Sequence, residues 1–87
     1  MSKKQNMPVY SQQLGAIRVA VWESSTDEGR VFQNVTITRS YREKSSEEWK
    51  ESSSFNGLAD LALVREAARL AANFIEQRER ELEPNDK

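Results

Sequence analysis

Apolar and polar residues alternate strictly at positions 17–22, where the odd residues are Ile or Val and the even residues are Arg, Ala and Trp. A period of two is typical of a strand that buries one face. The polar segment 24–29 follows and ends in glycine, which predicts a hairpin connection to a second strand.

That second strand is predicted from Arg30 to Arg42, because the segment is rich in β-branched residues. It is long for a strand, so we expect a strong twist or a bulge in it. A polar turn at 43–46 leads to a third alternating segment, 49–55. Short connections between consecutive strands predict an antiparallel meander.

A helix is predicted from Leu58 to about Leu82, since this segment holds no proline and is dominated by Ala, Leu, Glu and Arg. Asn56 is a suitable N-cap, and Pro84 ends the element. One stripe of the helix is apolar at three-four spacing and should bury against the sheet. The stripe consists of Leu63, Val64, Ala67, Leu70, Ala71, Phe74 and Ile75.

The predicted fold class is α+β, a three-stranded antiparallel meander followed by one long C-terminal helix packed on one face. Residues 8–13 could add a fourth strand. We expect a flexible N-terminal arm at 1–13, a single domain at 14–82 and a tail at 83–87.

With a single helix to cover it, the sheet has a covered face and a free face. The covered face is predicted to hold Ile17, Val19, Val21, Val35, Ile37 and Phe55. The free face is predicted to hold Arg18, Ala20, Trp22, Asn34, Thr36, Thr38, Ser40, Arg42, Lys50, Ser52 and Ser54.

The composition limits the chemistry. The chain contains no cysteine and no histidine, which removes thiolate nucleophiles, the commonest general base and most zinc sites. No pair of carboxylates is spaced to act as acid and base, so we expect no enzymatic activity, no cofactor and no metal. Thirteen basic and fourteen acidic residues nearly cancel, so the overall charge does not indicate a polyanionic partner.

The chain shows no sign of export or membrane insertion. No apolar run approaches the roughly 20 residues of a membrane span, and Met1–Pro8 lacks the apolar region of a signal peptide. We therefore expect a cytoplasmic protein with no membrane partner. A chain of 87 residues supports only a small core, so a partner subunit is an expected source of stability.

The expected free face suits a nucleic-acid backbone, because Arg and Lys neutralise phosphates and Ser, Thr and Asn donate to phosphate oxygens. Trp22 supplies a ring for stacking on an unpaired base. Alternatives stay open: such residues also serve as a merely solvated face, and Trp22 could pack under the second strand or into a subunit interface. Arg39 has the parity of the covered face, so either a bulge turns it outward or it pairs with a helix carboxylate.

Three stretches, 17–23, 34–41 and 49–55, resemble a group of small uncharacterised bacterial proteins. The meander with its long final helix also resembles the single-stranded-DNA-binding transcriptional coactivators of the positive-cofactor-four type, over residues 14–76. That resemblance implies a homodimer in which helices pair and curved sheets bind unwound DNA. Carried over by position, the binding residues are Arg18, Trp22, Arg39, Tyr41, Arg42, Trp49 and Lys50.

The helix predicts a homodimer by itself. Its apolar and alanine positions cover more than half of its circumference, which is more than one sheet can bury. The extra strip should meet a second subunit in a twofold arrangement, and Phe74→Asp should unfold or dissociate the protein. The expected interface residues are Leu61, Ala68, Leu70, Ala72, Phe74 and Ile75.

The sequence thus predicts a non-enzymatic homodimer that binds nucleic acid, single-stranded DNA first of all. Two alternatives stay open. One is a protein-interaction or oligomerisation module whose sheet face is only solvated. The other is a three-stranded sheet that enters the major groove of a duplex.

Overall fold

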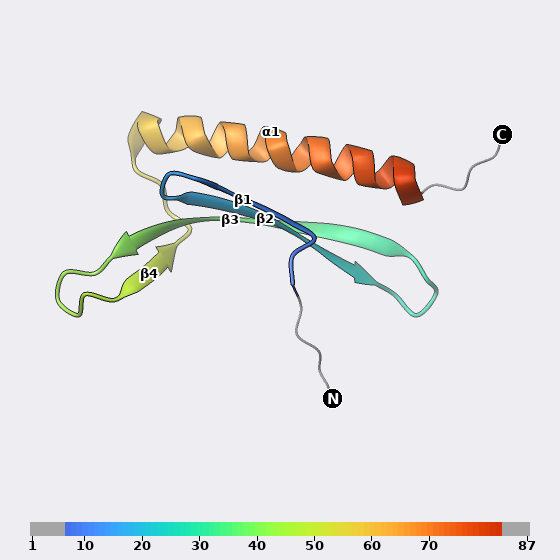
Figure 1. The fold of residues 1–87 in the computed structure, drawn as a ribbon, viewed down its shortest axis with the longest axis horizontal. Coiled ribbons are helices and arrows are strands. Elements are labelled where there is room, and N and C mark those ends of the chain that lie inside the picture. The colour runs from blue at the N-terminus through green and yellow to red at the C-terminus, as the bar shows by residue number, and fades with distance from the viewer. Residues whose placement is uncertain (1–6, 83–87) are drawn as a thin grey trace.

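The computed structural model describes residues 7–82 as four strands and one helix (Figure 1). The strands form one antiparallel sheet in the order β1-β2-β3-β4, and the helix packs on it. The predicted α+β class is confirmed, in its four-stranded form. The elements are β1 (Tyr10–Leu14), β2 (Ile17–Ser25), β3 (Val31–Arg42), β4 (Trp49–Ser52) and α1 (Gly57–Leu82).

Strand β1 comes from the segment expected to end a flexible arm. Leu14 pairs with Ile17 across a two-residue turn, and Gly15 in that turn has a φ of 64°. A hairpin turn of this length with positive φ at its first position favours glycine there. The folded domain therefore begins before residue 14. Residues 1–6 of the predicted arm and the predicted tail, 83–87, lie outside the described residues.

Strand β3 is 12 residues long and reaches both ends of the sheet. Its pairing with β2 is continuous from Val31 to Arg39, and its pairing with β4 is continuous from Arg39 to Arg42. The length of β3 is thus accommodated without a bulge in either register. The sheet curves instead, and the hairpins at its two ends bend away from α1 (Figure 1).

The core lies between α1 and the odd-numbered face of β2. Ile17, Val19 and Val21 are fully buried, and they pack with Ala67 and Ala71 of the helix. Small alanine side chains let the helix approach the strand closely. The predicted inward face of β2 is confirmed.

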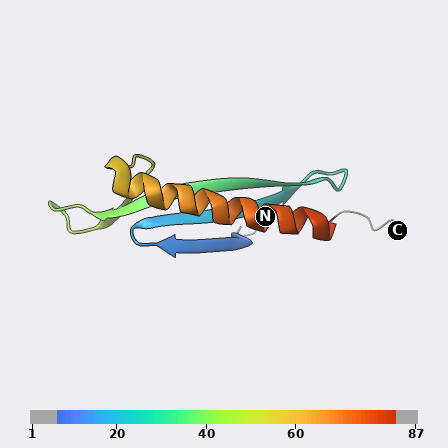
Figure 2. The same cartoon turned by 90° about the horizontal axis from the view of Figure 1, so that it is seen from above.

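Helix α1 crosses the sheet obliquely (Figure 2). Near its start, Asp60 lies 3.7 Å from Arg39 of β3. Further along, Phe74 stacks on Tyr10 of β1, with ring centroids 4.9 Å apart. The helix therefore leaves part of β3 bare. Val35 has the parity of the covered face, as the sequence predicts, but it stays 42% exposed because α1 lies over β1 at that level.

The first turn of α1 is closed by a carboxylate. Gly57 has a φ of 66°, and Asp60 Oδ2 accepts a hydrogen bond of 2.7 Å from the backbone N–H of Asn56. A negative side chain in the first turn also complements the helix dipole. Along residues 57–82 the helix is not apolar enough to cross a membrane.

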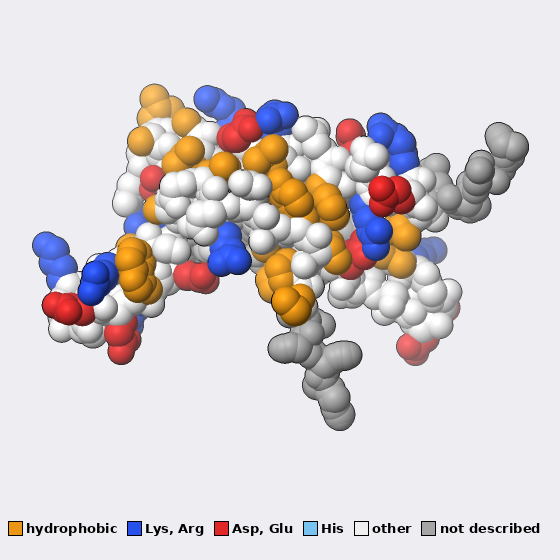
Figure 3. Space-filling view, in the orientation of Figure 1, with side chains coloured by type: hydrophobic (Ala, Val, Ile, Leu, Met, Phe, Trp, Pro, Cys, Tyr) orange, Lys and Arg blue, Asp and Glu red, His pale blue; other side chains and the backbone are white. Residues whose placement is uncertain are grey.

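Hydrophobic side chains gather beneath α1 in the middle of the molecule, and most charged side chains lie along the outer side of α1 or around the ends of the sheet (Figure 3). Arg78 of α1 donates two hydrogen bonds to Glu23 of β2, of 2.6 and 3.0 Å, and Gln33 donates a third. The bonds from Arg78 first, and then that from Gln33, hold the pKa of Glu23 below its usual value. This cluster fastens the last turns of the helix where the apolar core has ended.

Candidate nucleic-acid interface

The strand pairing fixes which side chains share a face of the sheet, because residues directly opposite in an antiparallel pair point to the same side. Arg18 pairs with Thr38 and Trp22 pairs with Asn34. At the other end of β3, Arg42 pairs with Trp49. The free-face strand residues are Ser11, Gln13, Arg18, Ala20, Trp22, Ser24, Phe32, Asn34, Thr36, Thr38, Ser40, Arg42, Trp49 and Glu51.

Strand β4 presents the opposite parity to the one predicted. Phe55 packs against the core as expected, but β4 ends at Ser52, so Phe55 reaches the core from the connection to α1. Its parity therefore does not extend back into the strand. Lys50 pairs with Tyr41 on the helix side, and Glu51 lies on the free face. The prediction that Lys50 and Ser52 lie on the free face is wrong, and Ser54 lies beyond the strand.

Three of the seven predicted binding residues, Arg39, Tyr41 and Lys50, lie on the helix side and contact other groups there. Arg39 Nε donates to the Ser54 carbonyl at 2.9 Å and lies 3.7 Å from Asp60 Oδ2. Pairing with a helix carboxylate, one of the two alternatives for Arg39, is thus confirmed. The guanidinium also lies 5.4 Å from the Tyr41 ring centroid, and Lys50 forms an ion pair of 3.2 Å with a turn glutamate.

The other four, Arg18, Trp22, Arg42 and Trp49, share the free face. The Arg42 guanidinium lies 6.0 Å from the centroid of the Trp49 ring, and Arg42 Nε donates to the carbonyl of Glu47. Trp49 is 68% exposed. Two cations and two indoles therefore stand on one surface whose other strand residues are mostly hydroxyl and amide side chains.

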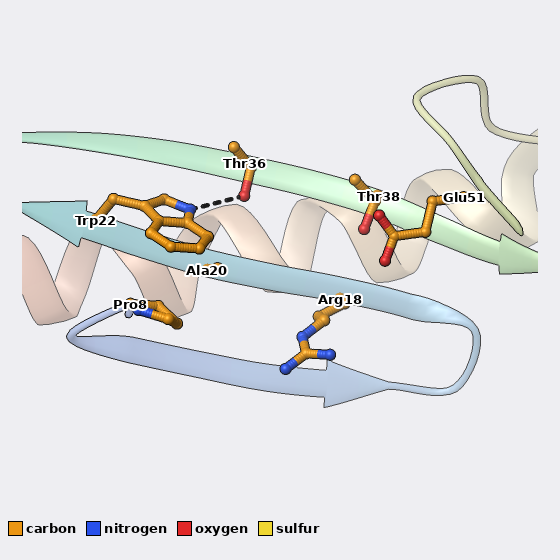
Figure 4. Close-up of a pocket in the computed structure, with 7 residues that line it drawn as sticks. All are labelled: Pro8, Arg18, Ala20, Trp22, Thr36, Thr38 and Glu51. Carbon is orange, nitrogen blue, oxygen red and sulfur yellow. Dashed lines mark hydrogen bonds between the residues drawn. The ribbon is translucent and has the colours of Figure 1, made fainter. Parts of the chain in front are cut away.

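A hollow of about 350 Å³ opens on this face between Trp22 and Arg18 (Figure 4). Its floor is Ala20, which is much smaller than its neighbours two positions away on either side. Trp22 Nε1 donates to Thr36 Oγ1 at 3.1 Å, which fixes the indole against β3. Trp22 is half-buried on the free face and takes no part in the core.

The other end of the hollow is lined by Thr38 and Glu51 on one side and by Arg18 on the other, with the Arg18 guanidinium turned toward β1 (Figure 4). None of the ion pairs among residues 7–82 involves Arg18 or Glu51. The guanidinium supplies only donors and the carboxylate only acceptors. Sequence reasoning missed Glu51, because the parity that would have placed it here was assigned to the other face.

The free face is weakly basic although the whole chain has a net charge of −1. Its strand residues include two arginines and one glutamate. Acidic residues gather instead in the two long connections between strands, as the sequence predicts. Those residues are Asp27, Glu28, Glu43, Glu47 and Glu48. Within residues 7–82 no three acidic side chains are grouped to hold a metal ion.

The residues predicted for a dimer interface divide into two groups. Some pack within the chain, where Phe74 and Ile75 contact the core and Leu70 is half-buried. The exposed members are Leu61, 52% exposed, and Ala68 and Ala72.

In comparisons with known proteins, no family model, no curated protein and no solved structure matched this chain. The resemblance to single-stranded-DNA-binding coactivators stays a prediction.

Proposed function

We propose that this chain is a non-enzymatic module that binds single-stranded nucleic acid through the free face of its sheet and works as a homodimer. The observation that supports the proposal most directly is the composition of that face. Arg18, Trp22, Arg42 and Trp49 stand on it together, and no helix among the described residues covers it.

Phosphate contacts supply most of the binding in this proposal. Arg18 and Arg42 neutralise phosphates, and the hydroxyls of Thr36, Thr38 and Ser40 between them donate to phosphate oxygens. The bend of both terminal hairpins away from α1 makes the free face concave (Figure 1). A flexible single strand can follow such a surface more closely than a straight duplex.

The tryptophans favour single strands for a second reason. An indole stacks on a base only when the base is unpaired and unstacked from its neighbours. Trp49 is 68% exposed at the β3–β4 end, and Trp22 forms a wall of the hollow in the middle of the sheet. The two rings therefore offer separate stacking positions along one strand.

The uncovered half of the helix side supports the homodimer. Four strands spaced about 4.8 Å apart are wider than one helix, whose diameter is about 10 Å. Val31 and Val35 of β3 face the helix side yet are 38% and 42% exposed. A second copy of α1 would cover them.

The flank of α1 has the pattern needed for that contact. Leu61, Ala68, Ile75 and Leu82 follow one another at seven-residue intervals, which is the spacing of residues that pair helices side by side. Of these, Ile75 is half-buried and also contacts the core of its own chain. Leu61 and Leu82 are 52% and 44% exposed. A twofold axis would bring this flank against its own copy and each bare β3 against the partner helix.

Titration of labelled oligo-dT at two salt concentrations tests the nucleic-acid function. We expect binding at low salt whose log affinity falls linearly with log salt, with a slope of about 0.7 for each phosphate neutralised. The double substitution Arg18→Ala and Arg42→Ala should weaken binding and flatten that slope.

The matched control is Arg65→Ala with Arg80→Ala, two exposed arginines of α1, which removes the same charge and should leave the slope unchanged. Equal losses in both double variants would show that only overall charge matters. Absence of oligo-dT binding at low salt would overturn the proposal and favour the alternative of a protein-interaction module. Tighter binding to duplex than to oligo-dT would favour a duplex reader.

A further inference from the structure

We infer that the hollow between Trp22 and Arg18 is a pocket for a single unstacked base, and that the base it fits best is guanine. The inference rests on the proposed binding of single-stranded nucleic acid and adds to it a preference for one base. It follows from three features of the hollow, which are its shape, its aromatic wall and the pair of opposite charges at its far end (Figure 4).

The shape of the hollow suits one flat ring system. Its volume of about 350 Å³ lies near the lower end of the range for small-molecule sites, which is about 300–1,000 Å³. Ala20 forms the floor and is only 6% exposed. On β2 the small Ala20 stands between two large side chains, Trp22 and Arg18. The hollow is the space that these two side chains enclose above Ala20.

Trp22, the aromatic wall of the hollow, is held in position for stacking on a base. Trp22 is held by its hydrogen bond to Thr36, so its ring loses little freedom when a base packs against it. The same bond uses the donor of the indole, which leaves the ring surface as the part that Trp22 offers. Pro8 lies across the hollow from Trp22 and adds a second apolar surface (Figure 4).

Inside the hollow, the charged end favours a base edge over a phosphate. Arg18 contacts a phosphate, as proposed above, when no base occupies the hollow, as with oligo-dT. A phosphate attracted by Arg18 would meet the carboxylate of Glu51 on the same hollow. A ligand that presents acceptors to the guanidinium and donors to the carboxylate satisfies both groups at once. Neither group pairs with another charged residue within 7–82.

Among the bases, guanine has adjacent donors, N1–H and the N2 amino group, and adjacent acceptors, O6 and N7. A carboxylate can accept both donors, and an arginine bonds O6 and N7 in bidentate fashion. Thymine has a single N–H between two carbonyls, so it offers one donor to Glu51 and sets two acceptors beside a negative charge. Cytosine and adenine offer one amino group next to an acceptor and satisfy the carboxylate only in part.

The experiment compares oligo-dT with the same oligonucleotide carrying one central G, A or C, by fluorescence anisotropy of labelled DNA and by quenching of tryptophan fluorescence. The full chain should bind the G-containing strand about tenfold more tightly than oligo-dT. Glu51→Gln should abolish that preference while leaving the affinity for oligo-dT unchanged or slightly higher, because the free face loses a negative charge.

The control variant is Glu48→Gln, which makes the same charge change in the exposed β3–β4 turn and should keep the preference for G. Equal affinities for all four strands would overturn the guanine pocket but leave nucleic-acid binding in place. A preference for G that survives in Glu51→Gln would also overturn it. If no strand binds, the proposed function itself fails.

Discussion

The two faces of strand β2 differ sharply in burial. On one face, Ile17, Val19 and Val21 are fully buried under α1. On the other, Arg18 is exposed and Trp22 is half-buried beside an open hollow. Burial of aliphatic side chains is the main favourable contribution to folding. One strand therefore serves stability with its odd residues and, in our proposal, binding with its even residues.

The largest effect that tests this comparison comes from neighbouring substitutions on β2. Ile17→Ala removes a fully buried side chain and should lower the free energy of unfolding by about 2–5 kcal/mol. That is a large part of the total of about 5–15 kcal/mol expected for a small domain. Arg18→Ala should change it by less than about 0.5 kcal/mol. Urea unfolding followed by circular dichroism measures both.

The pair also separates the two tasks. Arg18→Ala should lower the affinity for oligo-dT while the protein stays folded. If Arg18→Ala destabilises the fold as much as Ile17→Ala does, the free face contributes to stability and the division between the two faces is wrong.

An intermediate effect is expected on dimerisation, which in our proposal uses the helix side of the sheet, where α1 leaves β3 partly bare. Ala72 is exposed and lies one helical turn after Ala68 on the same flank of α1. Ala72→Arg places a long charged side chain there and should raise the dimer dissociation constant by more than about tenfold, equivalent to about 1.4 kcal/mol. Asn73→Arg adds the same charge at the next position, outside the flank, and should leave dimerisation unchanged. Sedimentation at several concentrations measures both constants.

Circular dichroism should show the same helix content in the two variants, since arginine is a good helix former. A wild-type chain that stays monomeric at every concentration would contradict the dimer, and so would equal loss of the dimer in Ala72→Arg and Asn73→Arg.

The smallest effect concerns Glu23 and the way its ionisation makes the stability of the fold depend on pH. Because the hydrogen bonds from Arg78 and Gln33 lower its pKa in the folded state, the unfolded chain takes up a proton more readily. The stabilisation is thus complete above the ordinary glutamate pKa of about 4.3 and is lost as the pH falls through the lowered value.

Glu23→Gln should therefore reduce the melting temperature by a few degrees at neutral pH and flatten its decline between about pH 5 and pH 3. Glu66→Gln is the control, since the pKa of Glu66 is also lowered, by a hydrogen bond from Arg69, but on the exposed surface, where such pairs contribute little. Parallel pH profiles of the wild type and Glu23→Gln would show that the cluster does not stabilise the fold.

Local alternation and helical spacing were sufficient to predict β2, β3, α1 and the burial of the odd residues on β2. They also predicted a strand at β4 (Trp49–Ser52), but they assigned its residues to the wrong faces, because the face of a strand depends on the register set by the turn before it. Glu47 has a φ of 59° in that turn, a geometry that the sequence did not reveal. Strand β1 was weakly signalled, since Gln12 breaks the apolar pattern between Tyr10 and Leu14 on the face toward the helix.

In the candidate site, too, some residues could be placed from the sequence and others could not. Arg18 and Trp22 were placed correctly because β2 alternates without a break, whereas Glu51 was missed with the parity of β4. The exposure of Val35 was also missed, because no residue of the chain encodes the oblique course of α1 by itself. That course results from contacts far apart in sequence, between Asp60 and Arg39 and between Phe74 and Tyr10.

Helix α1 is tied to the sheet by polar contacts toward both of its ends, from Asp60 to Arg39 and from Arg78 to Glu23. Because an α-helix is stiff, these two contacts fix the distance between the parts of the sheet that they join. Helix α1 therefore supports the sheet along its convex side. The helix thereby limits changes in the curvature of the sheet. In the proposed function, the spacing between Trp22 and Trp49 is thereby set before a ligand arrives, so a single strand bound there would adapt to the protein.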